Sequence, residues 1–555
     1  MGIPAMTDLL SGGKLIARAL AAEGVTHVFT LCGGHIMEIY EGCLDHGLRV
    51  VDLRHEQSAG FAAEGWARVT RRPGVALLTA GPGVTNGLTC MANAMQSNTP
   101  MVVIGGQAPH ALRDRGGLQE SDHIAMVGPV TKWARRVPEA ARAGEYVAAA
   151  FREALAGVPG PVFLEVPLDT MMTPFEATNT PDGDPLSDRP RTGVDPAKIE
   201  EAAAKLAAAE RPVVVAGSQV FWCDAAGRLR DLCDRLNLPA FLNGQGRGCL
   251  PPDHPSYLTG GRARAIAEAD LALVIGTPLD FRIGYGLAPA WPQDLELIRV
   301  DLDPTEIGRN RAAGVGIAGD VGLALEGMLA ALPTDAMPLD ESGEWLGRLR
   351  AADAAKRSKL DELAGRGEFP MHPIRVGAEI ARAIPDDAFV IGDGGDFVAS
   401  VAGMIRPSRA GRWLDAGPLG TLGVGPGYAM AAKLAHPEAA VVIAWGDGSV
   451  GFNGFDIESC VRQGIPFVAV VGNDAAWSQI RRGQVQMYGE ERAVATGLAP
   501  TDYSLISRAM GGGGEAIESA GELGPAIRRG LEADCPYVIN VPIGANELRA
   551  GSLSV

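Results

Sequence analysis

The side chains with the clearest chemical meaning lie in the last third of the chain. Asp447 stands between two glycines, and Asn473 follows shortly after the apolar run 467–471. Mg²⁺ prefers hard oxygen ligands in near-octahedral geometry and is usually held by carboxylates together with phosphate oxygens. Asp447 can supply a carboxylate oxygen, Asn473 an amide oxygen and Ala475 a main-chain carbonyl oxygen. This layout predicts a magnesium–diphosphate site.

The glycines that flank Asp447 suit a diphosphate beside the metal. Gly446 and Gly448 let backbone N–H groups approach phosphate oxygens, and the helix expected after Ser449 adds the positive end of its dipole. Glycine and aspartate are also common in ordinary strand-to-helix turns. The assignment therefore depends on a partner elsewhere in the chain.

That partner is Glu56, in the first third of the chain. The segment 50–56 is expected to form a short strand that ends in the carboxylate of Glu56, and the small-residue segment 58–68 is expected to form a helix. A second glycine-rich segment, 79–87, comes next. Taken alone, a glutamate at the start of a helix is also explained by its favourable interaction with the helix N-terminus.

Together these elements resemble the thiamine-diphosphate enzymes of the acetolactate-synthase-like family, from about residue 15 to 555. Within that family the chain is most similar to the 2-hydroxyacyl-CoA lyase branch. The segments that carry this finer similarity are 29–35, 276–282, 392–398, 412–415, 420–425, 472–477 and 551–555. One departure is Gly472, because the family motif usually carries two successive asparagines here. It leaves open whether Asn473 or Asp474 faces the metal.

The resemblance implies thiamine diphosphate as cofactor, bound together with Mg²⁺. Glu56 would lie beside N1′ of the aminopyrimidine and share a proton with it, which requires shielding from water. Leu422 would wedge between the two cofactor rings, although a plain core leucine is the alternative. Further cofactor contacts are expected from Gly81, Asn86, Gly394, Asp396, Phe397, Thr421, Gly446, Gly448, Ser449, Ala476 and Trp477.

Three further side chains are candidates for catalysis. The resemblance places a polar side chain at Gln119 near the reacting centre, where it can donate a hydrogen bond to an oxyanion. His35 can move protons at the mouth of the site, and Glu490 is the first-ranked base for removing a hydroxyl proton. Each has a simpler explanation: a solvated loop amide for Gln119, a structural role for His35 and a solvated acidic loop for Glu490.

The resemblance implies a 2-hydroxyacyl-CoA thioester as substrate, cleaved between C1 and C2 to formyl-CoA and an aldehyde or ketone. The middle of the chain would then bind the ADP part of CoA, since arginine suits phosphate and a carboxylate at a strand end suits ribose. The expected contacts are Arg262, Arg264, Arg282, Asp301 and Asp303. FAD occupies this domain in true acetolactate synthases; it is the less favoured ligand here, but the fold alone does not decide.

Two other functions compete with the lyase. A decarboxylating carboligase that condenses 2-oxo acids such as pyruvate would release CO₂ and need no CoA. A catalytically silent cofactor-binding scaffold is the third possibility. The joint presence of Glu56, Asp447, Asn473 and Leu422 argues against a silent protein.

Composition narrows the class of protein. The chain has 555 residues, a formal net charge of −17 and 8 cysteines without zinc-like spacing. Such acidity argues against nucleic acids and anionic membranes as partners. The sequence shows no signal peptide at its start and no apolar run of 18 residues, so we expect a cytoplasmic protein with reduced thiols.

Apolar strand-like runs alternate with alanine-rich helices throughout, which is typical of parallel α/β sheets. Polar stretches at 173–195 and 332–343 divide the chain into three doubly wound parallel-sheet domains. The predicted domains are 7–185 for the cofactor pyrimidine, 190–335 as the central unit and 365–555 for the diphosphate. The resemblance implies that the cofactor lies between two subunits, in a dimer or tetramer. The tail 546–555 is expected to cover the substrate.

Overall fold

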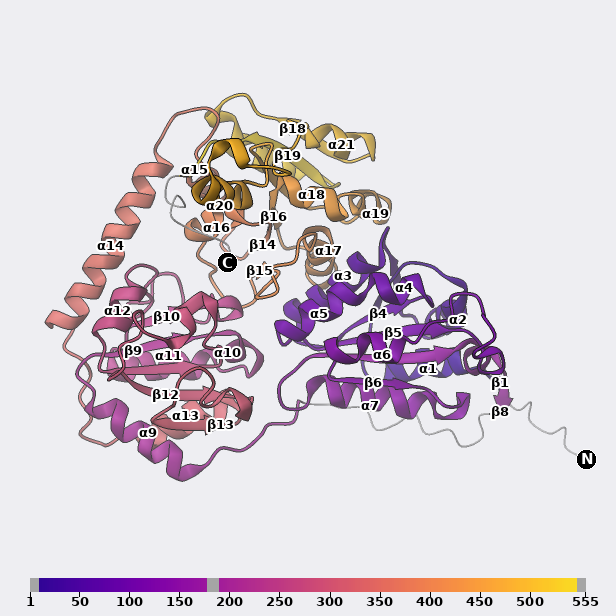
Figure 1. Cartoon of the computed structure of the whole chain (residues 1–555), viewed down its shortest axis with the longest axis horizontal. Coiled ribbons are helices and arrows are strands. Elements are labelled where there is room, and N and C mark those ends of the chain that lie inside the picture. Colours follow the sequence, from indigo (N-terminus) through magenta and orange to yellow (C-terminus); the bar gives the residue numbers. More distant parts are fainter. Residues whose placement is uncertain (1–8, 177–188, 547–555) are drawn as a thin grey trace, which may run out of the picture.

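The computed structural model describes residues 9–176 and 189–546 of the chain. Three α/β units follow one another along the sequence, and each is built around its own parallel sheet (Figure 1). The predicted fold class is therefore confirmed. The predicted linker 173–195 lies partly outside the described residues, as do residues 547–555 of the predicted cover. No helix in the described ranges is long and apolar enough to span a bilayer.

The N-terminal sheet has six parallel strands in the order β3-β2-β4-β5-β7-β6. The strands are β2 (His27–Thr30), β3 (Arg49–Asp52), β4 (Gly74–Leu78), β5 (Met101–Gln107), β6 (Trp133–Arg136) and β7 (Pro161–Pro167). Helices cover both faces: α1 (Gly12–Ala22), α2 (Met37–Asp45) and α7 (Ala143–Leu155) pack on one, α3 (Glu56–Thr70) and α5 (Leu88–Gln96) on the other. Strands β4, β5 and β7 are buried along their whole length, as a sheet covered on both faces requires.

The central sheet has five parallel strands in the order β10-β9-β11-β12-β13. They are β9 (Pro212–Ala216), β10 (Ala240–Leu242), β11 (Leu271–Ile275), β12 (Glu296–Asp301) and β13 (Val315–Ala318). The helices are α9 (Pro196–Ala208), α10 (Ser218–Trp222), α11 (Ala226–Leu236), α12 (Arg262–Glu268) and α13 (Val321–Ala331). A further helix, α14 (Glu344–Ala364), runs from this unit to the third (Figure 1).

The C-terminal sheet has six parallel strands in the order β15-β14-β16-β17-β19-β18. They are β14 (Phe389–Asp393), β15 (Trp413–Asp415), β16 (Val441–Gly446), β17 (Val468–Asn473), β18 (Gly513–Ala516) and β19 (Tyr537–Pro542). The helices are α15 (Pro373–Ala383), α16 (Asp396–Met404), α17 (Gly425–Ala435), α18 (Asp447–Asn453), α19 (Asp456–Gln463), α20 (Ser478–Tyr488), α21 (Tyr503–Ala509) and α22 (Leu523–Glu532).

The first and third units meet where α3 and α17 pack side by side (Figure 1). Close packing depends on glycine: a Cβ at Gly427 would lie 2.9 Å from the Ala62 nitrogen, and one at Gly65 would lie 2.9 Å from the Tyr428 Cα. A fully buried ion pair, Arg68 to Glu64 at 2.6 Å, lies beside this interface. One hydrophobic core continues across both units, so the N-termini of α3 and α17 hold fixed positions relative to each other.

Candidate active site

A cavity of about 360 Å³ opens at the carboxyl ends of β14, β16 and β17. This is the edge at which ligands bind to open parallel sheets, because loops and helix N-termini converge there. Of the cofactor contacts predicted from the sequence, those that line it are Gly394, Asp396, Phe397, Leu422, Gly446, Asp447, Gly448, Ser449, Ala476 and Trp477.

Asp447 is the first residue of α18 and is buried. Its Oδ1 accepts a hydrogen bond from the Gly448 N–H at 2.7 Å, while its Oδ2 is buried without a partner among the described residues. Burial, followed by the nearby carboxylate of Asp474, raises the pKa of Asp447 to about 6. A buried carboxylate oxygen with no donor is costly unless a cation binds it, so this residue fits a metal ligand.

The other two predicted metal ligands, Asn473 and Ala475, are not among the residues that line the cavity, and Asn473 Oδ1 accepts a hydrogen bond from the Ala475 N–H at 3.1 Å. The Asn473 amide donates to the Thr501 carbonyl at 2.8 Å and to Asn540 Oδ1 at 3.0 Å, which fixes its orientation. Ala475 has a left-handed backbone with φ of 52°, a conformation that costs a non-glycine residue about 1–3 kcal/mol. Proteins tolerate such strain where a turn has to orient a backbone group, and the backbone of Ala475 is oriented beside Asp447.

The described residues contain no group of three or more His, Cys, Asp or Glu side chains that could bind a metal. The donor set instead suits Mg²⁺ shared between one carboxylate, amide and main-chain oxygens, and the oxygens of a diphosphate. By this test the residues at the cavity fit a magnesium–diphosphate group.

Two glycines of the cavity make room for aromatic rings. A Cβ at Gly448 would lie 2.4 Å from the ring of Trp477, and one at Gly472 would lie 2.5 Å from the ring of Phe397. The Phe397 ring thus occupies the space in which an asparagine side chain at residue 472 would begin. A side chain at residue 472 would therefore require the Phe397 ring to move.

Asp393 holds the loop that carries Leu422. Its carboxylate accepts hydrogen bonds from the Gly423 N–H at 2.9 Å, the Gly425 N–H at 2.8 Å and the Ser449 hydroxyl. Burial raises the pKa of Asp393 to about 6. No role was predicted for Asp393 from the sequence; an aspartate at the end of a buried strand, followed by glycines, was the available signal.

Glu56 lies on the first unit, as the first residue of α3, and is buried. Asn86 donates to its Oε2 at 2.9 Å, so two of the predicted residues meet directly. The next side chain, Gln57, donates to the Leu422 carbonyl at 3.4 Å. Glu56 itself does not line the cavity of its own chain. Thr421 also lies beside the cavity rather than on its wall.

His35, Gly81 and Gln119 gather beyond the carboxyl ends of β2, β4 and β5. A Cβ at Gly81 would lie 2.8 Å from the Cβ of Gln119, whose own φ of 60° is left-handed. Burial lowers the pKa of His35, and a hydrogen bond with Gln119 opposes that shift. The His35 Nδ1 is buried without a partner in the described structure. Glu490 lies elsewhere: it is exposed, ion-paired with Arg481, and absent from the cavity wall.

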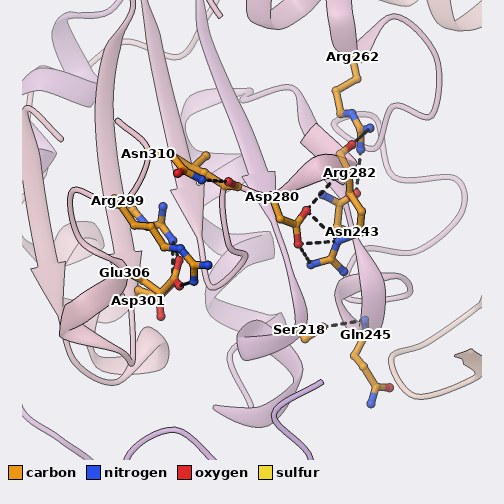
Figure 2. A network of polar contacts seen from close by, with 12 residues as sticks. Ser218, Asn243, Gln245, Arg262, Asp280, Arg282, Arg299, Asp301, Glu306 and Asn310 are labelled. Atoms are coloured by element: carbon orange, nitrogen blue, oxygen red, sulfur yellow. Dashed lines mark hydrogen bonds and ion pairs between the residues drawn. The ribbon is translucent and has the colours of Figure 1, made fainter. Parts of the chain in front are cut away.

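The structure separates the predicted CoA contacts into different places (Figure 2). Arg262 donates to Asn243 and to the Arg282 carbonyl, and Arg282 pairs with Asp280. Asp301 is buried and accepts a hydrogen bond from Gln219 at 2.7 Å.

The other two predicted CoA contacts, Asp303 and Arg264, each interact with a neighbouring residue of a helix. Asp303 caps a short helix by accepting from the Thr305 N–H at 2.8 Å. Arg264 is exposed beside Glu268. Of the five predicted residues, Arg262 and Arg282 are thus the two that line pockets, and these are different pockets.

A second pocket, of about 400 Å³, was not foreseen. We call it the basic pocket, because Arg247, Arg262, Lys356 and Arg406 line it. These residues come from the central unit, from α14 and from the segment after α16. Charges so far apart in the sequence form no linear pattern, so only the fold could reveal this cluster.

Family models and full-length relatives both match this chain over most of its length. Three family models match: "Thiamine pyrophosphate enzyme, N-terminal TPP binding domain" over residues 10–126, "central domain" over 199–328 and "C-terminal TPP binding domain" over 393–541. A "Probable acetolactate synthase" of Mycobacterium bovis is 40% identical, over 97% of this chain and 96% of that protein. "2-Hydroxyacyl-CoA lyase 2" of Danio rerio is 35% identical, over 98% and 93%, and that of Homo sapiens is 33% identical, over 98% and 92%.

Proposed function

The chain belongs to the thiamine pyrophosphate enzyme family, and on this premise we propose that it is a 2-hydroxyacyl-CoA lyase. In this proposal the enzyme uses thiamine diphosphate and Mg²⁺ and cleaves the C1–C2 bond of the acyl group. The products are formyl-CoA and an aldehyde or ketone, and the reverse reaction is an acyloin-type condensation.

The basic pocket is the observation that carries this proposal. Its cations are held mainly by neutral oxygen atoms: Arg247 donates to the carbonyls of residues 402 and 405, and Lys356 to the Thr259 carbonyl at 2.7 Å. Arg406 donates to the Pro252 carbonyl and to the Thr259 hydroxyl. Burial lowers the pKa of Arg247 and of Arg406. Arg247, Arg262 and Arg406 are half-buried and Lys356 is exposed. An anion stabilises partly buried cations, so this pocket suits the phosphates of CoA.

A carboxylate beside this pocket, that of Asp353, already has hydrogen-bond and ion-pair partners. Asp353 accepts hydrogen bonds from the Thr259 and Gly260 N–H groups at 2.8 and 2.7 Å and pairs with Arg357 at 2.5 Å. These bonds hold the pKa of Asp353 below its usual range although burial opposes them. The net positive charge of the pocket therefore remains available to a ligand.

One helix connects the basic pocket to the cavity. Asp396 and Phe397, at the start of α16, line the cavity, while Ala402 and Gly403, near its end, line the basic pocket. The 9 residues of this helix span roughly 13 Å at 1.5 Å per residue. A ligand with phosphates in the basic pocket and a thioester in the cavity needs an arm of that reach, which the pantetheine of CoA provides.

The residues of the site then have two kinds of role: some hold or donate a proton, and others position the reacting groups. Thiamine diphosphate, when bound, supplies a nucleophilic carbon and accepts the electron pair released by C–C cleavage. Glu56, oriented by Asn86, would hold a proton at N1′ of the aminopyrimidine, and Leu422 would pack against the cofactor rings. Gln119 would donate a hydrogen bond to the developing oxyanion.

Removal of the proton from the 2-hydroxyl group requires a base. Glu490 is the base predicted from the sequence, and it must leave Arg481 to act. His35 is the competing base, because burial lowers its pKa and so favours the neutral imidazole.

We further propose that two copies of the chain complete the site. Glu56 does not line the cavity of its own chain. Large apolar side chains near the cavity are exposed, including Phe452 at 54%, Phe455 at 71% and Tyr488 at 62%. On the first unit Leu118 is 79% exposed next to Gln119. A dimer or tetramer that covers these patches would bring the first unit of one copy to the cavity of another.

The carboligase remains the second candidate. It is favoured by the identity of 40% to a protein named as a probable acetolactate synthase, against 35% and 33% for the lyases. Such an enzyme would condense 2-oxo acids such as pyruvate and release CO₂.

A product assay separates the two candidates. Purified protein with thiamine diphosphate and Mg²⁺ is offered 2-hydroxyisobutyryl-CoA, a straight-chain 2-hydroxyacyl-CoA and pyruvate, with Glu56→Gln as the control. The proposal predicts formyl-CoA and a carbonyl product, reduced about 10²–10⁴-fold in the variant. Acetolactate and CO₂ from pyruvate, with both thioesters untouched, would refute the lyase.

A further inference from the structure

A buried acid–histidine pair lies behind the cofactor-facing residues of the first unit. His123 is the first residue of the short helix α6 (His123–Val127), and Glu165 lies on β7. Their Nδ1 and Oε1 atoms are 3.1 Å apart, and both side chains have no exposed surface. None of the roles assigned above uses this pair.

The hydrogen bonds fix the proton on the imidazole. The Gly81 N–H donates to His123 Nε2 at 2.9 Å, so Nε2 is an acceptor and carries no proton. The proton therefore lies on Nδ1, which faces Glu165. Gln107 and Arg136 also donate to Glu165. Burial alone would raise the pKa of Glu165, but the bonds from His123 and Arg136 hold it below its usual range.

Gly81 connects this pair to the activating carboxylate. It precedes α4 (Pro82–Asn86) with a φ of 59°, in the left-handed region that favours glycine. The last residue of this helix, Asn86, donates to Glu56 at 2.9 Å. The turn at Gly81 therefore sets where Asn86, and through it Glu56, is held.

Gly81 also contacts Gln119. A Cβ at Gly81 would lie within 2.8–3.1 Å of three Gln119 atoms, so the two backbones are in close contact. Gln119 has the left-handed φ of 60°, which the packing around it must maintain. One peptide nitrogen, bonded to His123, thus lies between the two groups that face the cofactor and the substrate.

We propose that His123 and Glu165 are positioning residues, which hold the Gly81 turn so that Glu56 and Gln119 keep their reactive geometry. The inference rests on the thiamine-diphosphate part of the proposed function and not on the identity of the substrate. Misplacing a reacting group by about 1 Å can cost on the order of a hundredfold in rate, so a small shift of this turn is enough to matter.

The test compares His123→Leu, which removes the acceptor, with His123→Gln, whose amide can accept from Gly81 and donate to Glu165. A matched control is Val127→Ala, a buried residue of the same helix outside the hydrogen-bond chain. The first measurement is the rate of hydrogen–deuterium exchange at C2 of bound thiamine diphosphate at saturating cofactor. The second is amide exchange of Gly81 in protein without cofactor.

We expect His123→Leu to slow C2 exchange at least about tenfold and to expose the Gly81 amide, and His123→Gln to restore both within about threefold. Val127→Ala should lower the melting temperature while C2 exchange stays within twofold. The proposal is overturned if folded His123→Leu exchanges within twofold of the wild type, or if Val127→Ala slows exchange equally.

If His123→Leu does not fold, Glu165→Gln takes its place. It keeps an acceptor for Nδ1 but loses the charge, and C2 exchange should slow at least threefold while His123→Gln stays close to the wild type. Unchanged exchange in Glu165→Gln would then refute the proposal. Neither readout uses a CoA thioester, so failure of the lyase assignment would leave this test intact.

Discussion

The cavity around Asp447 and the basic pocket around Arg406 lie at the two ends of α16, yet they are built differently. The cavity takes its walls from the carboxyl ends of one sheet, where glycines allow backbone N–H groups to face a ligand. The basic pocket takes single side chains from several parts of the chain. The first is suited to the cofactor of the family, and the second is the site that we propose selects the substrate.

This difference predicts that variants of the two sites will lose different activities. A change in the cavity should abolish every reaction, because every reaction needs the cofactor. A change in the basic pocket should affect only substrates that carry the phosphates of CoA.

The largest effect is expected from Asp447→Asn. The change removes the charge of the buried carboxylate that fits Mg²⁺, so activity with any substrate should fall more than about a hundredfold, beyond the 10–100-fold typical for loss of an outer-shell partner of a metal. Isothermal titration should show weakened binding of Mg²⁺–thiamine diphosphate. Full activity with undiminished cofactor affinity would exclude Asp447 as a metal ligand.

A smaller and selective effect is expected from Arg406→Ala. Loss of a hydrogen bond to a charged group costs about 1.5–3 kcal/mol, so KM for a 2-hydroxyacyl-CoA should rise about 10–100-fold with kcat nearly unchanged. The matched control is Arg409→Ala, an exposed arginine three residues away that lies beside Asp387. An equal rise in KM in both variants would show that general electrostatics, and not the basic pocket, is responsible.

The smallest effect is expected from pH. Because burial raises the pKa of Asp447 to about 6, this group binds a proton below that pH, and Mg²⁺ must then displace the proton. The apparent Mg²⁺ affinity should therefore weaken as pH falls from 7 to 5, by up to about tenfold per pH unit below 6. Titration of Mg²⁺ at several pH values checks this. A flat profile would mean that Asp447 stays ionised throughout.

Many of the predicted cofactor contacts lie together at the cavity because they follow one another along strands and turns. Gly446, Asp447 and Gly448 are contiguous, and their turn must lie at the edge of a parallel sheet once the preceding strand is assigned. Phe397 and Trp477 were also predicted at this site, and both rings line the cavity. At this site, residues that are neighbours in the sequence are also neighbours in the cavity.

The basic pocket could not be predicted in this way. Arg247, Lys356 and Arg406 stand far apart in the sequence, and only Arg262 of this cluster was selected. Asp301 was selected because it ends a strand, but its carboxylate bonds to Gln219 inside the unit. A strand-end aspartate can face a ligand or close a loop, and the sequence does not distinguish these two uses.

His123 and Glu165 of the first unit also could not be predicted from the sequence. Neither belongs to a motif, and their relation to Gly81 depends on the pairing of β5 with β7 and on the place of α6. Residues that act through other residues leave little trace in a single sequence. They become visible once hydrogen bonds between distant segments are known.

The most direct test of the substrate assignment compares two thioesters of the same acyl group. Wild-type protein is offered 2-hydroxyisobutyryl-CoA and the corresponding pantetheine thioester, which lacks the phosphates, and kcat/KM is measured for each. If the basic pocket binds CoA, kcat/KM should favour the CoA thioester by about 10²-fold or more, since several charge-assisted bonds are lost without the phosphates. Equal values for the two thioesters would contradict the account.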